Sequence, residues 1–133
     1  MMISTKGRYA LRVLIDLAEH QNEGYIAMKK VAERQGLSLK YIEKIMPVLS
    51  KSNYVEGVHG KGGGYRLSHS PKDYIVGDIL RLAEGDLAPV ACLECNAKKC
   101  DRADSCPTLP MWKEFYTMVN NYFDNITISD LMK

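Results

Sequence analysis

The stretch that decides the fold is residues 37–67, which read LSLKYIEKIMPVLSKSNYVEGVHGKGGGYRL. Its first half places apolar side chains at helical spacing after Ser38, a residue type that caps helix N-termini. Pro47 falls within this half and is expected to kink the last turns or to shift the end of the helix. Its second half contains two short β-prone runs, 54–58 and 65–67, around a glycine-rich turn. A helix followed directly by a β-hairpin is the pattern of a winged helix.

Two further helices are predicted upstream of this stretch. Residues 6–20 carry apolar side chains at steps of three and four, with Ser4 or Thr5 as the cap. Residues 28–35 form a second helix, which stops at Gly36 because glycine readily adopts the left-handed conformation of a helix end. Two short helices joined by a tight glycine-containing turn are typical of a helix-turn-helix motif.

In such a motif the second helix enters the DNA major groove with its first residues at the base edges. Lysine at those positions suits phosphate or guanine, and Glu43 suits the cytosine amino group. The wing glycines allow the backbone to approach a phosphate or the minor groove. Surface pairing of Glu43 with a neighbouring lysine, and a wing tip without a partner, are the alternatives. The predicted DNA-binding residues are Ser38, Lys40, Tyr41, Glu43, Lys44, His59, Gly60 and Lys61.

The charge of the 133-residue chain is unevenly distributed. Residues 1–72 carry twelve Lys/Arg against six Asp/Glu, whereas residues 73–133 carry six Lys/Arg against ten Asp/Glu. This asymmetry favours a chain that touches a polyanion with one end, although solvated surface charge would look the same. The sequence has no apolar run of about 18 residues and no secretory signal at its start, so we expect a cytoplasmic protein.

The second half is expected to hold a connecting helix at 76–84, a loop at 86–108 and a long helix at 109–125. The long helix carries a wide aromatic stripe with little left in its own chain to pack against, which favours an interface with a second copy. Ser129 is the predicted cap of a last short turn. The predicted fold class is mainly α with a small β-hairpin wing. Its predicted parts are a winged helix-turn-helix DNA-binding domain (1–72), a connecting helix with a cysteine-rich sensor loop (73–108), and a dimerisation helix with a C-terminal turn (109–133).

All four cysteines lie in the loop, as Cys92-x2-Cys95-x4-Cys100-x5-Cys106. In a reducing compartment such a group favours metal or redox chemistry over disulfides. Clustered thiolates select zinc, copper(I) or iron–sulfur centres. Only one C-x2-C pair is present, which fits a loop around a cluster better than a pair of zinc knuckles. Redox-active free thiols and a structural zinc site are the alternatives.

Several motifs, in this order along nearly the whole chain, resemble the IscR-like, Rrf-two family of winged-helix repressors. The cysteine loop followed by Trp112 also fits this family. The matching motifs are Ile3-Ser4-Thr5-Lys6-Gly7-Arg8-Tyr9-Ala10-Leu11-Arg12, Leu37-Ser38-x2-Tyr41-x-Glu43, His59-Gly60-x2-Gly63-Gly64-Tyr65-x-Leu67, and Gly77-Asp78-Ile79 with Glu84-Gly85.

This resemblance implies a homodimeric repressor or activator of transcription whose DNA affinity depends on an iron–sulfur cluster, either [2Fe–2S] or [4Fe–4S]. Three cysteines usually hold the cluster in the family. By alignment to the pattern ending C-x5-C, they are Cys92, Cys100 and Cys106 here. Leu109 and Arg8 stand where some members carry a fourth ligand, which leaves Cys95 as the local candidate for that position.

Two-fold symmetry of the protein would match a palindromic double-stranded DNA operator. The main alternative is a cluster-free regulator that senses redox state through its thiols or reads a protein partner. A small redox enzyme or electron carrier would leave the wing unexplained. The three histidines are far from the cysteines in sequence and no nucleophile–base group is visible, so we predict no enzymatic activity.

Overall fold

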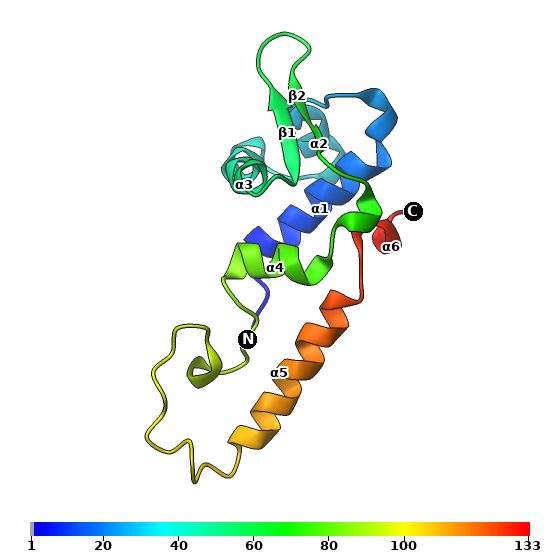
Figure 1. Cartoon of the computed structure of the whole chain (residues 1–133). Coiled ribbons are helices and arrows are strands. Elements are labelled where there is room, and N and C mark those ends of the chain that lie inside the picture. The colour runs from blue at the N-terminus through cyan, green and yellow to red at the C-terminus, as the bar shows by residue number, and fades with distance from the viewer. Residues whose placement is uncertain (1) are drawn as a thin grey trace.

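The computed structural model describes residues 2–133, and the chain is mainly helical (Figure 1). β1 and β2 form an antiparallel hairpin in which Val55 faces Leu67 and Val58 faces Gly64. This architecture confirms the expected fold class. The elements are α1 (Thr5–Glu19), α2 (Met28–Gln35), α3 (Leu39–Lys51), β1 (Val55–Val58), β2 (Gly64–Leu67), α4 (Val76–Glu84), α5 (Leu109–Asp124) and α6 (Ile128–Leu131), with single 3-10 turns at Gln21–Glu23, Pro71–Asp73 and Ala91–Leu93.

The helix ends of the helix-turn-helix follow from local chemistry. Ser4 caps α1 by accepting a hydrogen bond from the Gly7 amide, and Ser38 caps α3 by accepting one from the Tyr41 amide. Gly36 ends α2 in the left-handed conformation with φ of 64°. Gly36 and Ser38 therefore define the turn between α2 and α3, and Ser4 defines the start of α1.

α3 continues through Pro47 to Lys51, so of the two effects predicted for the proline, a shift of the helix end is excluded. One local expectation is corrected. Thr127, rather than Ser129, caps the last short helix, because its side chain accepts from the Asp130 amide while the Asp130 carboxylate accepts from the Thr127 amide. This reciprocal pair is a capping box.

The main hydrophobic core is formed by buried side chains of α1, α2, α3 and the base of the wing. Tyr74 and Ile128 are fully buried in this same core although they follow the wing in sequence. The Ile128 amide donates to the Tyr74 carbonyl at 2.9 Å, and the Tyr74 hydroxyl donates to the Tyr54 carbonyl. The last short helix, α6, therefore completes the core that α1 begins.

A buried ion pair joins α1 to α2. The Asp16 side chain is only 1% exposed, and both of its carboxylate oxygens accept from the Arg34 guanidinium, at 2.6 and 3.0 Å. The Gln35 side-chain amide adds a third hydrogen bond at 3.0 Å. A buried carboxylate needs such partners because desolvation penalises an unpaired charge.

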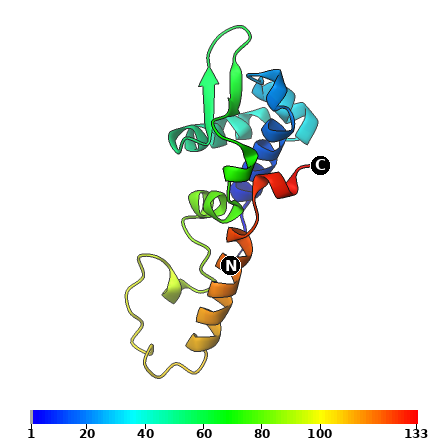
Figure 2. The same cartoon turned by 45° about the vertical axis from the view of Figure 1, so that its right-hand side comes forward.

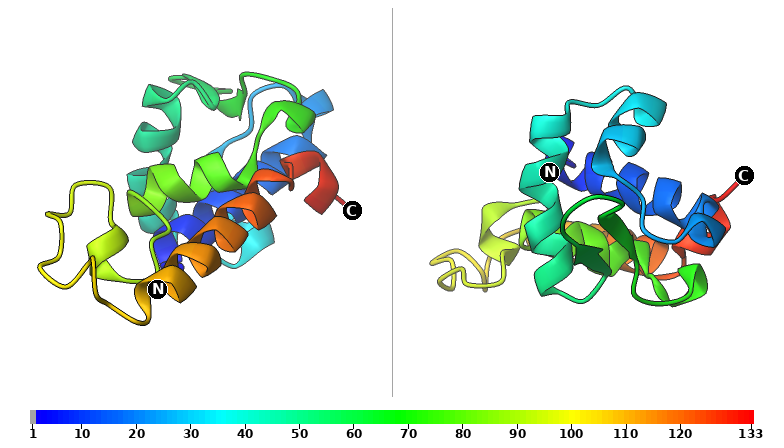
Figure 3. Two further views of the ribbon diagram at one scale, coloured as in Figure 1. Left: turned by 60° about the horizontal axis from the view of Figure 1, so that its bottom comes forward. Right: turned by 90° about the horizontal axis from the view of Figure 1, so that it is seen from above.

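The molecule is elongated, and the wing and the cysteine-containing loop lie at its opposite ends (Figure 2). The wing projects from one end, and the loop between α4 and α5 hangs from the other. Figure 3 shows α5 running alongside α4 and away from the helix-turn-helix. Within residues 2–133, no helix combines the length and apolar character needed to cross a membrane.

Candidate DNA-binding surface and cysteine pocket

The start of α3 presents most of the predicted DNA-binding side chains to solvent. Lys40, Glu43 and Lys44 are exposed, whereas Ser38 uses its hydroxyl as the helix cap. Tyr41 is half-buried and packs edge-to-face on Tyr9 of α1, with ring centroids 5.3 Å apart. The Tyr41 ring therefore anchors the start of α3 against α1.

The wing places His59, Gly60 and Lys61 at its exposed tip. Gly60 has φ of 94°, a conformation that side-chain-bearing residues rarely adopt, so glycine is needed for the turn. Arg66 lies lower on the hairpin, where it pairs with Glu56 and stacks 4.4 Å from the Tyr25 ring centroid. Arg66 thus braces the base of the wing, while the tip remains exposed to solvent.

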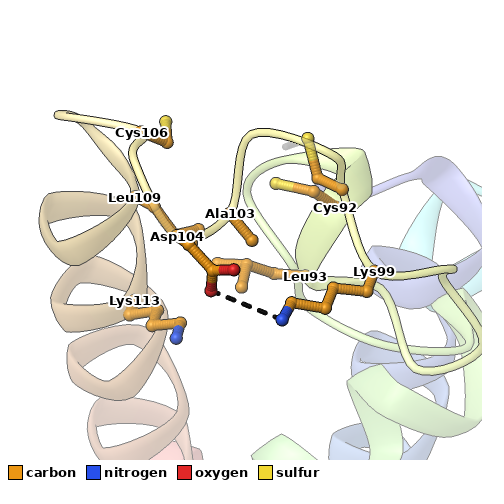
Figure 4. Close-up of a pocket in the computed structure, with 9 residues that line it drawn as sticks. Cys92, Leu93, Lys99, Ala103, Asp104, Cys106, Leu109 and Lys113 are labelled. Atoms are coloured by element: carbon orange, nitrogen blue, oxygen red, sulfur yellow. Dashed lines mark ion pairs between the residues drawn. The ribbon is translucent and has the colours of Figure 1, made fainter.

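Three of the four cysteines face one pocket of about 410 Å³ at the start of α5 (Figure 4). Cys92 and Cys100 are exposed, and Cys106 is half-buried. Within residues 2–133, no three side chains of His, Cys, Asp or Glu lie close enough together to hold a metal ion in this structure. Nine residues line this pocket, hereafter the cysteine pocket: Cys92, Leu93, Lys99, Cys100, Ala103, Asp104, Cys106, Leu109 and Lys113.

Cys95 faces a different, more open depression of about 300 Å³, shared with Asp86 and Glu94. Its backbone amide donates to Asp86 Oδ2 at 2.9 Å. The structure therefore places Cys92, Cys100 and Cys106 around one pocket and Cys95 in another.

Cys106 lies just before α5, where hydrogen-bond donors converge on its sulfur. The Thr108 hydroxyl, 3.5 Å from Sγ, is the largest cause of a lowered pKa of this thiol. The backbone amides of Thr108 and Leu109 and the charge of Arg102 lower the pKa further, against a small opposing effect of burial. A lowered pKa increases the thiolate fraction at neutral pH, and the thiolate is the form that binds metals and reacts.

Replacing Thr108 with valine is expected to raise the pKa of Cys106, because the main hydrogen bond to the sulfur is lost. The pH midpoint for alkylation of Cys106 by iodoacetamide, followed by mass spectrometry on metal-free protein, should move upward. Thr117→Val is the matched control, since Thr117 lies on the same helix and bonds to the Lys113 carbonyl. An unchanged midpoint in Thr108→Val would contradict the assigned cause.

The base of the cysteine loop is tied to the DNA-binding region through the end of α4. Glu84 Oε1 accepts from the amide and hydroxyl of Ser4, the cap of α1. Two residues later, Asp86 accepts from the amides of Ala88 and Cys95, and Leu87 is buried against α4 and α5. The base of the loop is therefore connected, through Glu84, to the first turn of α1.

The long helix α5 has two distinct apolar faces. One face packs against α4 through the half-buried side chains of Tyr116, Val119 and Phe123. The other face is exposed and recurs at steps of four, three and four residues, which forms a continuous stripe on a helix. This exposed stripe consists of Met111 (53% exposed), Phe115 (42%), Met118 (61%) and Tyr122 (66%).

The sequence interpretation missed three pocket side chains, Lys99, Asp104 and Lys113. Asp104 lies between Cys100 and Cys106, so its place in the C-x5-C spacing was the available signal. Lys113 follows Leu109 by one helical turn, which puts both on the face of α5 that meets the loop.

A helix-turn-helix with an adjoining β-hairpin, an exposed basic start of α3 and a glycine-rich wing defines a winged-helix DNA-binding protein. A family model named Rrf2 and described as an iron-dependent transcriptional regulator matches residues 3–133. The chain belongs to the Rrf2 family, which confirms the resemblance inferred from its motifs.

Related proteins and structures agree with this assignment. Protein rrf2 of Nitratidesulfovibrio vulgaris is 38% identical and aligns with all of this chain and 88% of its own length. The regulator IscR of Aliivibrio salmonicida is 33% identical over 99% of this chain and 77% of its own.

Two solved structures share the fold over 98% of this chain. T. potens IscR is 37% identical, with a TM-score of 0.79 and 85% of that chain covered. CymR of B. subtilis, described as a global cysteine regulator, is 34% identical, with a TM-score of 0.81 and 95% covered. The chain is accordingly a DNA-binding transcriptional regulator, and the prediction that it is not an enzyme is confirmed by these relatives.

Proposed function

We propose that this chain is a homodimeric regulator whose binding to a palindromic operator is controlled by an iron–sulfur cluster. The single observation that carries the proposal is the shared cysteine pocket, which Cys92, Cys100 and Cys106 line together at the start of α5. Three thiols of this kind suit cluster iron, which prefers soft ligands. When bound, the cluster would supply a centre sensitive to oxidation, nitric oxide or iron shortage.

The protein side of the switch is a reorganisation of the loop. The three sulfurs must draw closer together to hold one group, because their present spacing does not form a metal site within residues 2–133. Closure of the loop would act on Asp86 and Glu84, and through Glu84 on Ser4 at the start of α1. Such coupling requires the closed loop to favour one arrangement of the recognition helices.

At the DNA end, we propose that Lys40 and Lys44 contact phosphate or guanine and that Glu43 reads cytosine. Their exposure at the start of α3 supports this assignment. At the wing tip, His59, Gly60 and Lys61 are proposed to reach the minor groove or its phosphates. Tyr41, which is half-buried, and Ser38, which caps α3, hold this helix in place. Both are also proposed to contact DNA at the start of α3.

We further propose that the exposed stripe of α5 forms the dimer interface. Large apolar side chains in a continuous exposed row favour burial against a partner. A two-fold dimer through α5 would place two recognition helices on one operator. This assigns dimerisation to residues 109–133, sensing to residues 73–108 and DNA binding to residues 1–72.

Replacing Phe115 with aspartate is expected to weaken the dimer, because the interface would then have to bury an unpaired carboxylate. We expect a loss of about 2 kcal/mol or more, as for a central interface residue, which is roughly 30-fold in the dimer Kd. Sedimentation over a range of protein concentrations measures it. Thr117→Asp, at an exposed position on another face of α5, is the control. If Phe115→Asp and Thr117→Asp have the same dimer Kd, the exposed stripe of α5 is not the dimer interface.

The proposal is tested by purifying the protein without oxygen and measuring its iron, acid-labile sulfide and visible absorption. The same preparation then selects binding sites from a pool of duplexes with a randomised segment of about three helical turns. We expect a brown protein that enriches an inverted repeat, and an affinity for that repeat that changes when the cluster is removed. A colourless protein after reconstitution with iron and sulfide would overturn cluster control.

A second candidate function, direct sensing through the thiols, is favoured by the lowered pKa of Cys106. One similar solved structure is Staphylococcus aureus CymR in an oxidized form, 31% identical with a TM-score of 0.78. On this alternative, the iron-free protein would bind DNA and lose affinity when Cys106 is oxidised. Titration of DNA binding with hydrogen peroxide, with and without Cys106→Ser, distinguishes the two functions.

A further inference from the structure

The cysteine pocket contains one side chain besides its three thiols that is able to ligate iron, and that side chain is Asp104. Lys99 and Lys113 carry ammonium groups, and the remaining lining residues are apolar. We propose that the Asp104 carboxylate is the fourth ligand of the cluster. This inference rests on the proposed function and specifies how its site is completed.

The position of Cys95 supports this choice. Its side chain faces the separate depression beside Asp86 and Glu94, and its backbone is held there by the 2.9 Å hydrogen bond to Asp86. Cys95 could enter the cysteine pocket only if this part of the loop moved out of that depression. Asp104 already lies in the pocket, between Cys100 and Cys106 in sequence.

The charges around the pocket fit the same assignment. Lys99 Nζ lies 3.3 Å from Asp104 Oδ1, and this pair spans the pocket while both side chains remain largely exposed (Figure 4). An exposed ion pair of this kind contributes little to stability, so it opens easily. A cluster held by three thiolates and one carboxylate is negatively charged overall. Once Asp104 turns to iron, Lys99 and Lys113 remain beside that charge as its counterions.

A carboxylate is a harder ligand than a thiolate and suits cluster iron less well. The bond to Asp104 would therefore be the weakest of the four and the first to open. The iron bound by Asp104 becomes the place where an incoming small molecule or oxidant gains access. The fourth ligand then sets how fast the regulator responds, while the three cysteines set whether it holds a cluster at all.

The test compares four variants of the full chain after anaerobic reconstitution: Asp104→Ala, Asp104→Cys, Asp101→Ala and Cys95→Ala. Asp101 is the matched control because it is an exposed acid of the same loop that does not line the pocket. The readouts are the visible spectrum, the EPR spectrum of the reduced protein and the rate of iron loss to a chelator.

We expect Asp104→Ala to change the EPR spectrum and to lose iron at least about tenfold faster, as for a weakened metal shell. Asp104→Cys should retain the cluster with an all-thiolate spectrum, while Asp101→Ala and Cys95→Ala match the unsubstituted protein. An unchanged Asp104→Ala together with an altered Cys95→Ala would overturn the inference and leave cluster control intact. An unsubstituted protein that takes up no iron and sulfide would instead overturn the proposed function.

Discussion

Replacing Cys100 with alanine is expected to abolish cluster binding and leave the fold intact. Cys100 is exposed in the loop and lines the cysteine pocket with Cys92 and Cys106, outside both hydrophobic cores. Removing one of three thiols leaves too few soft ligands for cluster iron. Iron and sulfide content after anaerobic reconstitution should fall to background, with loss of the visible absorption.

Ser105→Ala is the control for this substitution, because Ser105 is an exposed loop residue that does not line the pocket. Thermal unfolding of metal-free Cys100→Ala, followed by circular dichroism, should match that of the metal-free unsubstituted protein. A visible spectrum that survives in Cys100→Ala would show that Cys100 is not a ligand of the cluster.

The largest effect on stability is expected from Arg34→Met. This change leaves the buried Asp16 carboxylate with Gln35 as its remaining side-chain donor, while the methionine keeps the apolar length of the side chain. Breaking a buried ion pair from one side typically costs 3–5 kcal/mol. We expect about 3 kcal/mol here, the low end, because the Arg34 side chain is itself 30% exposed. Denaturant unfolding measures the change.

Lys29→Met is the control, since Lys29 is an exposed basic residue of the same helix. The double variant Asp16→Leu with Arg34→Met should be more stable than Arg34→Met alone, because no unpaired charge is then buried. If Arg34→Met lowers the free energy of unfolding by less than about 1 kcal/mol, the Asp16–Arg34 pair contributes no more than an exposed ion pair does, and the prediction is wrong.

The local elements of this fold were predictable from sequence because their signals lie within a few residues of each other. Ser4, Ser38 and Gly36 act at the helix ends where their chemistry predicts, and the wing follows from the glycine-rich turn between two β-prone runs. Pro47 does not end α3, which continues to Lys51, so the proline alone was a poor guide to the end of this helix.

Contacts between distant segments were not predictable in this way. Asp16 and Arg34 are ordinary charged residues in sequence, and their burial follows only from the packing of α1 on α2. The same holds for Asp104, which looked like one more loop acid until the pocket placed it with the thiols. The cysteine spacing predicted a shared site, but it could not tell which side of the loop Cys95 faces.

The aromatic stripe of α5 shows that helical periodicity alone does not predict which part of an apolar helix surface is buried within the same chain. Periodicity predicted one wide apolar surface including Phe115, Tyr116 and Tyr122. Only the position of α4 divides that surface, leaving Tyr116 half-buried against α4 while Phe115 and Tyr122 point to solvent. The proposed dimer face is therefore narrower than the sequence pattern, and includes Met111 and Met118, which the aromatic pattern left out.

The burial of Ile128 beside α1 affects how the protein is made. More than a hundred residues separate α1 from α6 in the chain, so α1 finds this core partner only after the ribosome has synthesised residue 128. Until then the nascent chain exposes an apolar gap that chaperones or proteases recognise. A fragment that ends before residue 128 is therefore expected to be degraded because its core is incomplete, even when it retains both the DNA-binding region and the cysteine loop.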